Sequence, residues 1–385
     1  MQTVRSRSFV PHPSGSRACM ARRALACAVL ALAGLAPAAC AQVTGPVAIS
    51  PERAPEAQGY RVETVAEGLN RPWGLAFLPD GAMLVTEKDG ALLRLTPLAD
   101  GASAGAPARA TIAGVPPVFS GGQGGLMDVA LHPRFAENSL VYLTLSEGTG
   151  EANRTVLVRA TLAGDRLENV QTIFRVSQQK RGGQHFGSRI LWLPDGTMLL
   201  AIGDGGNPPT SLDGRLIRLN AQERSSHLGK ILRLNDDGTP AADNPFAGEQ
   251  GAAPEVWSYG HRNIQGLTRD PESGRVWATE HGARGGDELN LVRAGANFGW
   301  PAVTYSREYM GPRISEETTR EGMVDPKAVW TPAQAPSGLA FYTGDAIPAW
   351  RGSLFSGGLV TGEIRRLTLE GEKVTGEESI RIGQR

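Results

Sequence analysis

Cysteine is almost absent from this chain of 385 residues. The three cysteines, Cys19, Cys27 and Cys40, all lie within the first 40 residues. The body that follows can therefore form neither a disulfide nor a thiolate metal site, and its stability must come from a hydrophobic core. Long apolar runs are missing as well. No stretch reaches the roughly 20 residues that a membrane-spanning helix needs, so no integral membrane span is expected.

The chain also lacks net charge, with 39 basic and 39 acidic residues. This balance is uneven, because residues 1–41 hold five arginines and no acid. The remainder carries 34 basic against 39 acidic residues, a charge of −5 with histidine neutral. A mildly acidic body argues against nucleic acids and anionic membranes as partners.

Residues 1–41 are predicted to be a signal peptide. Arg22 and Arg23 precede the apolar run ALACAVLALAGLAP, which ends in small residues. Cleavage after Ala41 would yield an exported protein, either periplasmic or secreted. A lipid anchor on Cys40 is the alternative.

What the chain does have is a repeated hairpin. Glycine and proline number 49 and 26, enough for many tight turns. The segment GLAFLPDGAMLVTEKDG (74–90) recurs as SRILWLPDGTMLLAIGDGG (188–206). Each copy is a short apolar strand, a Pro-Asp-Gly turn and a second apolar strand. Looser copies occupy residues 128–146, 266–282 and 338–359.

A hairpin followed by a further strand, repeated along the chain, is the blade pattern of a β-propeller. Five blades can be counted, and a sixth appears only as a beginning. We therefore expect an all-β, six-bladed propeller over residues 59–385, with its last blade incomplete at the C-terminus. Residues 42–58, rich in Pro and Ala, predict a flexible linker before it.

The hairpin centred near Asp195 predicts one pair of reactive side chains. His185 and Asp204 are almost equidistant from the turn, so they should meet at the same end of a blade. A carboxylate beside an imidazole orients the ring and raises its basicity, as a general base requires. The alternative is a loop histidine beside an aspartate that caps a Gly-rich turn.

The following hairpin predicts a second cluster by the same argument. Arg262 and Asn263 fall opposite Gly282 and Ala283, in a Gly-rich loop that also carries Asp287. Backbone carbonyls with a carboxylate suit a hard cation such as calcium. The rigid donor fork of an arginine suits a planar anionic ligand. A solvated acidic turn with a structural arginine is the alternative.

Several long motifs then occur in a recognisable order, namely GGQGGLMDVALHP, the His-to-Asp hairpin, GHRNIQG and EHGARGGDELNLV followed by NFGWP. In these motifs residues 60–385 resemble the soluble aldose sugar (glucose/sorbosone) dehydrogenases, six-bladed propellers that depend on pyrroloquinoline quinone (PQQ). The resemblance implies oxidation of the C1 hydroxyl of an aldose to a lactone, with hydride transferred to calcium-bound PQQ.

The resemblance also implies a role for each matching residue. His185 would be the general base and Asp204 its partner, with Arg262 as a further catalytic group. The expected quinone contacts are Gln123, Arg262, Asn263 and Arg385. The expected calcium ligands are the carbonyls of Gly282 and Ala283 and the side chain of Asp287.

Two departures from the family pattern concern the quinone. Val360 stands where better-known members carry a lysine that contacts a PQQ carboxylate. Members also carry an Arg-x-Arg-Asp stretch whose arginines contact PQQ; Arg385 matches the first arginine, and the chain then stops. We therefore expect a truncated version of a longer natural protein, weak in PQQ binding.

The expected partners are an aldose substrate and an external electron acceptor, for a chain that acts as a monomer or a homodimer. Two other functions fit a propeller. One is a calcium-dependent lactonase or other hydrolase, which needs acidic and amide side chains converging from several blades. The other is a ligand-binding propeller without catalysis.

Overall fold

The computed structural model describes residues 48–51, 53–97 and 107–382. The expected signal peptide, Cys40 and Arg385 lie outside these residues. The described part is all-β apart from the short helical turns α1 (Phe135–Asn138), η1 (Ile217–Gln222) and η2 (Pro348–Trp350). None of its helices is long and apolar enough to cross a bilayer.

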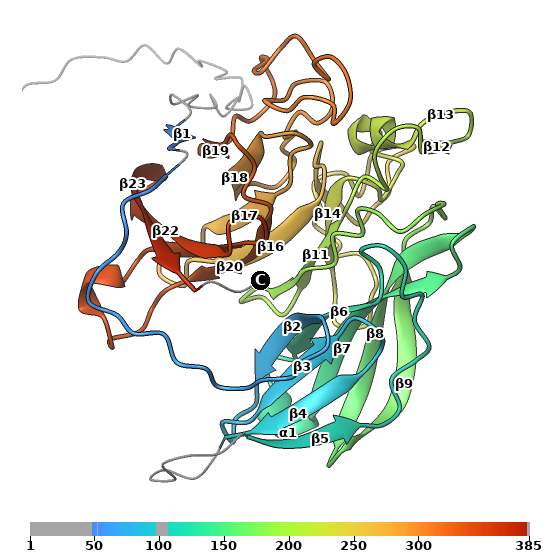
Figure 1. Cartoon of the computed structure of the whole chain (residues 1–385). Helices are drawn as coiled ribbons and strands as arrows, with labels where there is room; N and C mark the ends of the chain where they lie inside the picture. The colour runs from blue at the N-terminus through green and yellow to red at the C-terminus, as the bar shows by residue number, and fades with distance from the viewer. Residues whose placement is uncertain (1–47, 52, 98–106, 383–385) are drawn as a thin grey trace, which may run out of the picture. The chain divides into compact units, whose positions relative to one another are not determined.

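Five sheets are arranged around a common centre (Figure 1). The first consists of β2 (Pro72–Phe77), β3 (Met83–Glu87), β4 (Leu92–Thr96) and β5 (Ala108–Ile112). The second consists of β6 (Leu126–Leu131), β7 (Leu140–Gly148), β8 (Asn153–Ala163) and β9 (Arg166–Arg175). The third consists of β10 (Ile190–Trp192), β11 (Met198–Ile202), β14 (Lys230–Leu234) and β15 (Val256–Tyr259).

The remaining two sheets repeat the pattern. The fourth consists of β16 (Ile264–Arg269), β17 (Val276–Glu280), β18 (Asp287–Val292) and β19 (Ala328–Trp330), with β1 (Ala48–Ser50) added in parallel to β19. The fifth consists of β20 (Pro336–Phe341), β21 (Leu354–Gly358), β22 (Glu363–Glu370) and β23 (Lys373–Arg381). A small hairpin, β12 (Ser211–Leu212) with β13 (Arg215–Leu216), projects from the third sheet.

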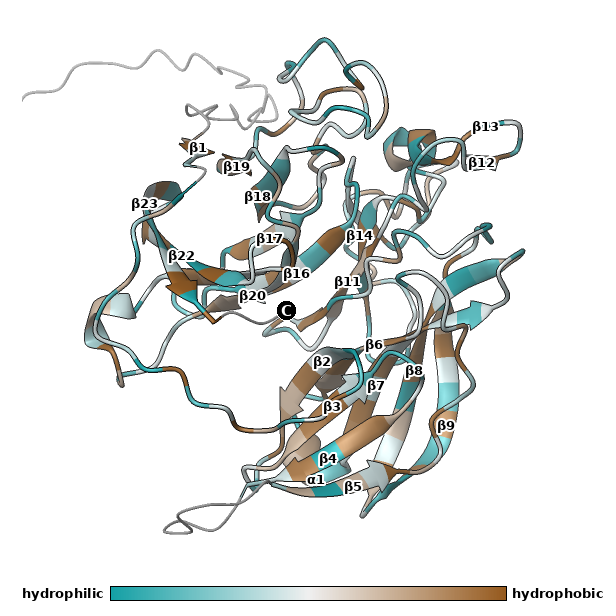
Figure 2. Ribbon diagram, in the orientation of Figure 1, coloured by the Kyte–Doolittle hydropathy of each residue, from teal (hydrophilic) through white to brown (hydrophobic). Residues whose placement is uncertain are grey.

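Each of the five predicted hairpins forms the first two strands of one sheet. In the third sheet Ile190 pairs with Leu200 and Trp192 with Met198, so the turn is centred on residue 195 as expected. The β-propeller class is thereby confirmed. Successive sheets bury apolar side chains between their faces, and four clusters each join two neighbouring sheets. Figure 2 shows this apolar character on β2 to β4, whereas the outer strand β9 is mixed.

The count of six blades is not confirmed. Among the described residues no sixth four-stranded sheet forms, because β22 and β23 pair with each other from Glu363–Arg381 to Glu370–Lys373 and so complete the fifth sheet. No apolar cluster of the described residues joins the fifth sheet to the first. On that side β2 leaves Phe77 68% exposed and Leu75 49% exposed.

Part of the expected flexible linker pairs with the sheets. Strand β1 lies within it, and the Ala57 N–H donates to the Ser379 carbonyl of β23 at 2.8 Å. The Ser379 N–H in turn donates to the Pro55 carbonyl at 2.7 Å. Composition suggested a loose segment, but the free edges of β19 and β23 offer it backbone partners.

Candidate active site

The candidate site forms where three inner strands begin. Gln123 precedes β6, His185 precedes β10, and Arg262 with Asn263 precedes β16. These strands surround one central axis and run in the same direction along it. The loops that precede them therefore converge at one end of that axis. Propeller folds commonly carry ligand sites there.

His185 and Asp204 meet as the hairpin spacing predicted. The His185 Nδ1 lies 2.6 Å from the Asp204 Oδ1, and both side chains are buried. The Gly206 N–H also donates to Oδ1 at 3.1 Å. The structure thus brings the pair together, while its catalytic role remains a prediction.

The backbone at His185 is held in an uncommon conformation. Its φ of 48° lies in the left-handed region, which costs a non-glycine residue about 1–3 kcal/mol. The Gln123 side-chain oxygen accepts the His185 N–H at 2.7 Å. Gly203 packs so closely that a Cβ there would lie 2.2 Å from the His185 carbonyl oxygen. These contacts fix the direction in which the imidazole projects.

The environment keeps this imidazole neutral. Burial, reinforced by the Arg262 guanidinium, lowers the pKa of His185 to about 4 even though the Asp204 carboxylate opposes the shift. At neutral pH the ring therefore carries one proton, and a carboxylate at Nδ1 draws that proton to this side. Nε2 is then left with a lone pair. A neutral ring with an unprotonated Nε2 can accept a proton. The net shift is downward, however, so the expectation that the carboxylate raises the basicity of this imidazole is wrong: burial outweighs Asp204.

Lys180 is a second buried base near the pair, and sequence reasoning missed it. Its ammonium lies 3.8 Å from the centre of the Phe186 ring and donates to the Gly182 carbonyl at 3.2 Å. Burial lowers the pKa of Lys180 to about 7, and the nearby Asp204 carboxylate opposes that shift. Nothing in its local sequence distinguishes it from a surface lysine.

Arg262 and Asn263 lie across from Gly282, as their hairpin predicted. One Arg262 nitrogen, Nη1, donates to the carbonyls of His281, at 2.9 Å, and of Gly282. The other, Nη2, donates to the Asn207 side-chain oxygen at 2.6 Å. Among the described residues, the buried Arg262 Nε and Asn263 Nδ2 have no hydrogen-bond partner.

Asn207 and Trp300 belong to the same cluster and were not predicted. The Asn207 Nδ2 lies 3.5 Å from the His185 Nε2, the ring nitrogen that Asp204 does not contact. The Trp300 indole N–H donates to the Asp204 Oδ2 at 2.8 Å. Asn207 directly follows the Asp-Gly-Gly turn, and Trp300 is part of NFGWP, so their motifs were visible. Their contacts were not, because Trp300 is 96 residues from Asp204 in sequence.

The predicted calcium loop is formed, but the Gly282 and Asp287 oxygens have other partners. The Asp287 carboxylate accepts the N–H groups of Gly282 at 2.8 Å and of Gln334 and Ala335 at 2.7 Å each. The Gly282 carbonyl faces the Arg262 cation. Within the part of the chain that the structure describes, no group of three or more His, Cys, Asp or Glu side chains is placed to hold a metal. As arranged, Gly282 and Asp287 do not fit a calcium ion.

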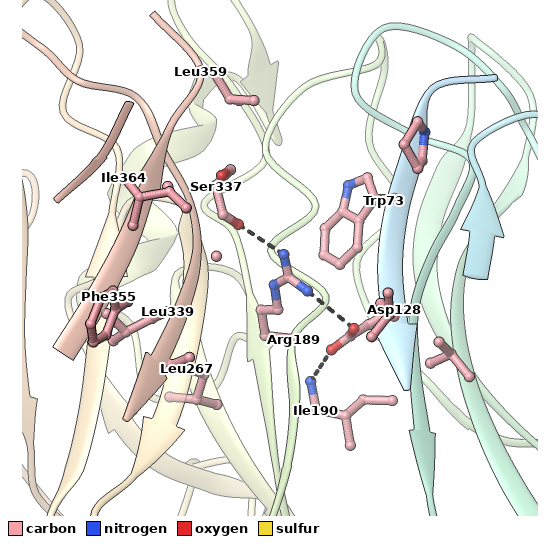
Figure 3. A pocket seen from close by; sticks show the side chains of 16 residues that line it. Trp73, Asp128, Arg189, Ile190, Leu267, Ser337, Leu339, Phe355, Leu359 and Ile364 are labelled. Atoms are coloured by element: carbon pink, nitrogen blue, oxygen red, sulfur yellow. Dashed lines mark hydrogen bonds and ion pairs between the residues drawn. The ribbon is translucent and has the colours of Figure 1, made fainter. Parts of the chain in front are cut away.

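A cavity of about 620 Å³ lies farther along the inner strands (Figure 3). Trp73, Asp128, Arg189 and Ser337 are among the residues that line it, and none of the predicted site residues does. Val360, which occupies the expected lysine position, is 58% exposed in the turn after β21.

The comparisons with known proteins agree on one family. A family model described as glucose/sorbosone dehydrogenase matches residues 69–385. The chain is 56% identical over 328 residues to the Synechocystis protein slr1608, covering 83% of this chain and 79% of that protein. It is 38% identical to the aldose sugar dehydrogenase YliI of Escherichia coli, covering 82% of each. The PQQ-bound aldose sugar dehydrogenase of Streptomyces coelicolor superimposes with a TM-score of 0.65 at 33% identity, covering 85% of this chain and 86% of that one.

Proposed function

The chain belongs to the glucose/sorbosone dehydrogenase family, and from that membership and the site geometry we propose that it is a PQQ-dependent aldose sugar dehydrogenase. It would oxidise the C1 hydroxyl of an aldose to a lactone. The observation that carries the proposal is the buried His185–Asp204 pair. The His185 Nε2 lies 3.5 Å from the Asn207 amide, whose oxygen accepts from Arg262.

The residues present fit a quinone that carries carbonyl and carboxylate acceptors. The Arg262 Nε and Asn263 Nδ2 are buried donors without a partner among the described residues, and such groups are costly unless a ligand satisfies them. Both would hold PQQ, with Gln123 near the base. When bound, PQQ supplies the two-electron acceptor for the hydride from C1.

The protein's own residues account for the proton transfer. His185 Nε2 would accept the proton of the C1 hydroxyl, because Nδ1 is already engaged by Asp204. The imidazolium formed would be stabilised by the buried Asp204 carboxylate, which also prevents the ring from turning. The Asn207 amide, 3.5 Å from Nε2, would lie beside the substrate oxygen and help to orient it.

Calcium takes no step in this mechanism, since Gly282 and Asp287 do not fit it as arranged. If calcium binds, its proposed ligands remain the carbonyls of Gly282 and Ala283 and the Asp287 side chain. We expect Arg262 to release the Gly282 carbonyl on calcium binding, because a guanidinium and a calcium ion at the same oxygen would repel each other. Calorimetric titration of the protein with calcium, with and without PQQ, tests this expectation.

The cellular setting completes the proposal. The arginine pair and apolar run before Ala41 support export, to the periplasm or beyond, with Cys40 as the alternative lipid anchor. Electrons would leave to an external acceptor, and the protein would act as a monomer or a homodimer.

One experiment tests the function directly. The purified chain is titrated with PQQ while its absorbance is followed, and aldoses are then added with a dye as electron acceptor. We expect a bound chromophore that an aldose reduces, and dye reduction that requires PQQ. His185→Gln is the matched variant, which should keep the bound chromophore and lose the sugar-dependent reduction. The assignment is wrong if the wild-type protein neither binds PQQ nor oxidises any aldose.

A further inference from the structure

The Asp204 carboxylate has a second fixed partner besides His185. Its Oδ1 receives His185 Nδ1 and the Gly206 N–H, whereas its Oδ2 receives the Trp300 indole N–H at 2.8 Å. The carboxylate is fully buried and Trp300 is 5% exposed, so little water competes for this contact. The bond joins the third sheet to the loop after β18.

Trp300 is held in place through both its backbone and its ring. Its backbone N–H donates to the Gly260 carbonyl at 2.9 Å, and its backbone carbonyl accepts from the Gln222 side chain at 2.8 Å. The guanidinium groups of Arg262 and Arg218 lie 5.3 and 5.8 Å from the ring centre. A cation over the ring face attracts its π electrons and favours one ring orientation. The donor therefore arrives at Oδ2 already oriented.

The chemistry of these donors determines where the dyad proton lies. An indole nitrogen and a backbone amide can only donate, so neither can receive a proton from the carboxylate. Asp204 is therefore an acceptor toward both, and its remaining acceptor direction at Oδ1 takes the proton of His185 Nδ1. Nε2 then keeps the lone pair. Without the indole, Oδ2 would be a buried acceptor without a partner, and the carboxylate could turn away from the imidazole.

We propose that Trp300 is a positioning residue of the reaction: its indole N–H fixes the Asp204 carboxylate so that His185 presents an unprotonated Nε2. This inference rests on the proposed function of His185 as the base. Trp300 acts through Asp204 and has no direct part in the chemistry. Partners that orient a metal-bound histidine change activity about 10–100-fold when removed, and we expect a loss of similar size for this carboxylate–histidine pair.

The decisive variant is Trp300→Phe, which keeps an aromatic ring and removes the N–H. We expect kcat for aldose oxidation to fall about 10–100-fold, with KM and the PQQ dissociation constant nearly unchanged. In an Asp204→Asn background the same substitution should have almost no further effect, since the carboxylate through which it acts is gone. Additive losses in the two backgrounds, or a kcat within about twofold of wild type, would overturn the proposal.

Trp330→Phe is the matched control. Its indole N–H also donates to a buried carboxylate, that of Glu377 at 2.9 Å, and Trp330 is 2% exposed. Removing this bond perturbs the core in a similar way without touching the dyad. Its effect on kcat should therefore be small, and an equal loss in both variants would mean that Trp300 has only a structural role.

A spectroscopic measurement separates this inference from the proposed function. In protein labelled with ¹⁵N-histidine, the His185 signals, assigned by their absence in His185→Gln, should report an Nδ1–H tautomer in wild type and a mixture in Trp300→Phe. This readout needs neither PQQ nor sugar, so it holds even if the enzyme activity is misassigned. An unchanged tautomer in Trp300→Phe would refute the inference. Should that variant not fold, Asp204→Asn must shift the Trp300 indole N–H resonance and leave that of Trp330 unmoved, and an unshifted Trp300 resonance would refute it equally.

Discussion

The Arg189 guanidinium contacts all four of the other sheets of the propeller, and Figure 3 shows it between Asp128 and Ser337. Arg189 itself precedes β10 of the third sheet. Its nitrogens donate to the Asp128 carboxylate of the second sheet at 3.1 Å, to the Gln265 carbonyl of the fourth at 2.6 Å and to the Ser337 carbonyl of the fifth at 2.8 Å. It also stacks on Trp73 of the first sheet, 4.1 Å from the ring centre. We therefore expect Arg189→Ala to loosen all five sheets.

The expected magnitude follows from the burial of these groups. Asp128 is 6% exposed, and removing one partner of a buried ion pair costs about 3–5 kcal/mol, since the other charge is left uncompensated. Burial already raises the pKa of Asp128, and Arg189 is the first influence that opposes it. The variant should therefore bind a proton at Asp128 on folding. For a domain with a total stability of about 5–15 kcal/mol, this loss is a large fraction.

Urea unfolding followed by circular dichroism measures the effect, with Arg293→Ala as the control. Arg293 pairs with Glu372 at 2.6 Å on the surface, where its side chain is 44% exposed. Its loss should cost less than about 1 kcal/mol. Arg189 holds Asp128 and Gln265, which follow the proposed quinone contacts Gln123 and Asn263 closely in the sequence. Arg189→Ala should therefore shift those contacts and weaken PQQ binding. If Arg189→Ala lowers the free energy of unfolding no more than Arg293→Ala does, Arg189 does not hold the five sheets together.

Three further predictions concern the site itself. His185→Gln should lower kcat by about two to four orders of magnitude in the dye assay with PQQ still bound, and near-normal turnover would show that the base is another residue. Because the pKa of His185 is lowered to about 4 in the folded state, the unfolded chain binds a proton there at a higher pH than the folded protein does. The free energy of unfolding should therefore be unaffected above about pH 6.5, the ordinary pKa, and should fall by up to about 3 kcal/mol as the pH decreases to about 4. Unfolding curves of wild type and His185→Gln should therefore converge over this range, and parallel curves would contradict the shift. Asp287→Asn should cost about 1–3 kcal/mol in thermal unfolding, because an amide nitrogen would face one of three backbone donors, and an unchanged midpoint would contradict that.

Local sequence was enough to predict the hairpins of the sheets and two pairings within the site. A Pro-Asp-Gly turn fixes the register of its hairpin, and the register places the residues on either side opposite each other. His185 and Asp204 could therefore be paired from their distances to residue 195, and Arg262 could be placed opposite Gly282 in the same way. The family resemblance rested on motifs of the same kind, and the family is confirmed. The count of six blades rested on five repeated hairpins and the beginning of a sixth, and it is not confirmed.

Tertiary structure alone decided the contacts that cross between sheets. Trp300 reaches Asp204 from another sheet, and Arg189 gathers partners as far away as Ser337, 148 residues along the chain. No periodicity or turn signal encodes such distances, because they depend on how neighbouring sheets pack. The state of the calcium loop was hidden for the same reason. Its composition suits a hard cation, but whether Asp287 is free to bind one depends on backbone N–H groups from residues 334 and 335, which only the folded chain brings to it.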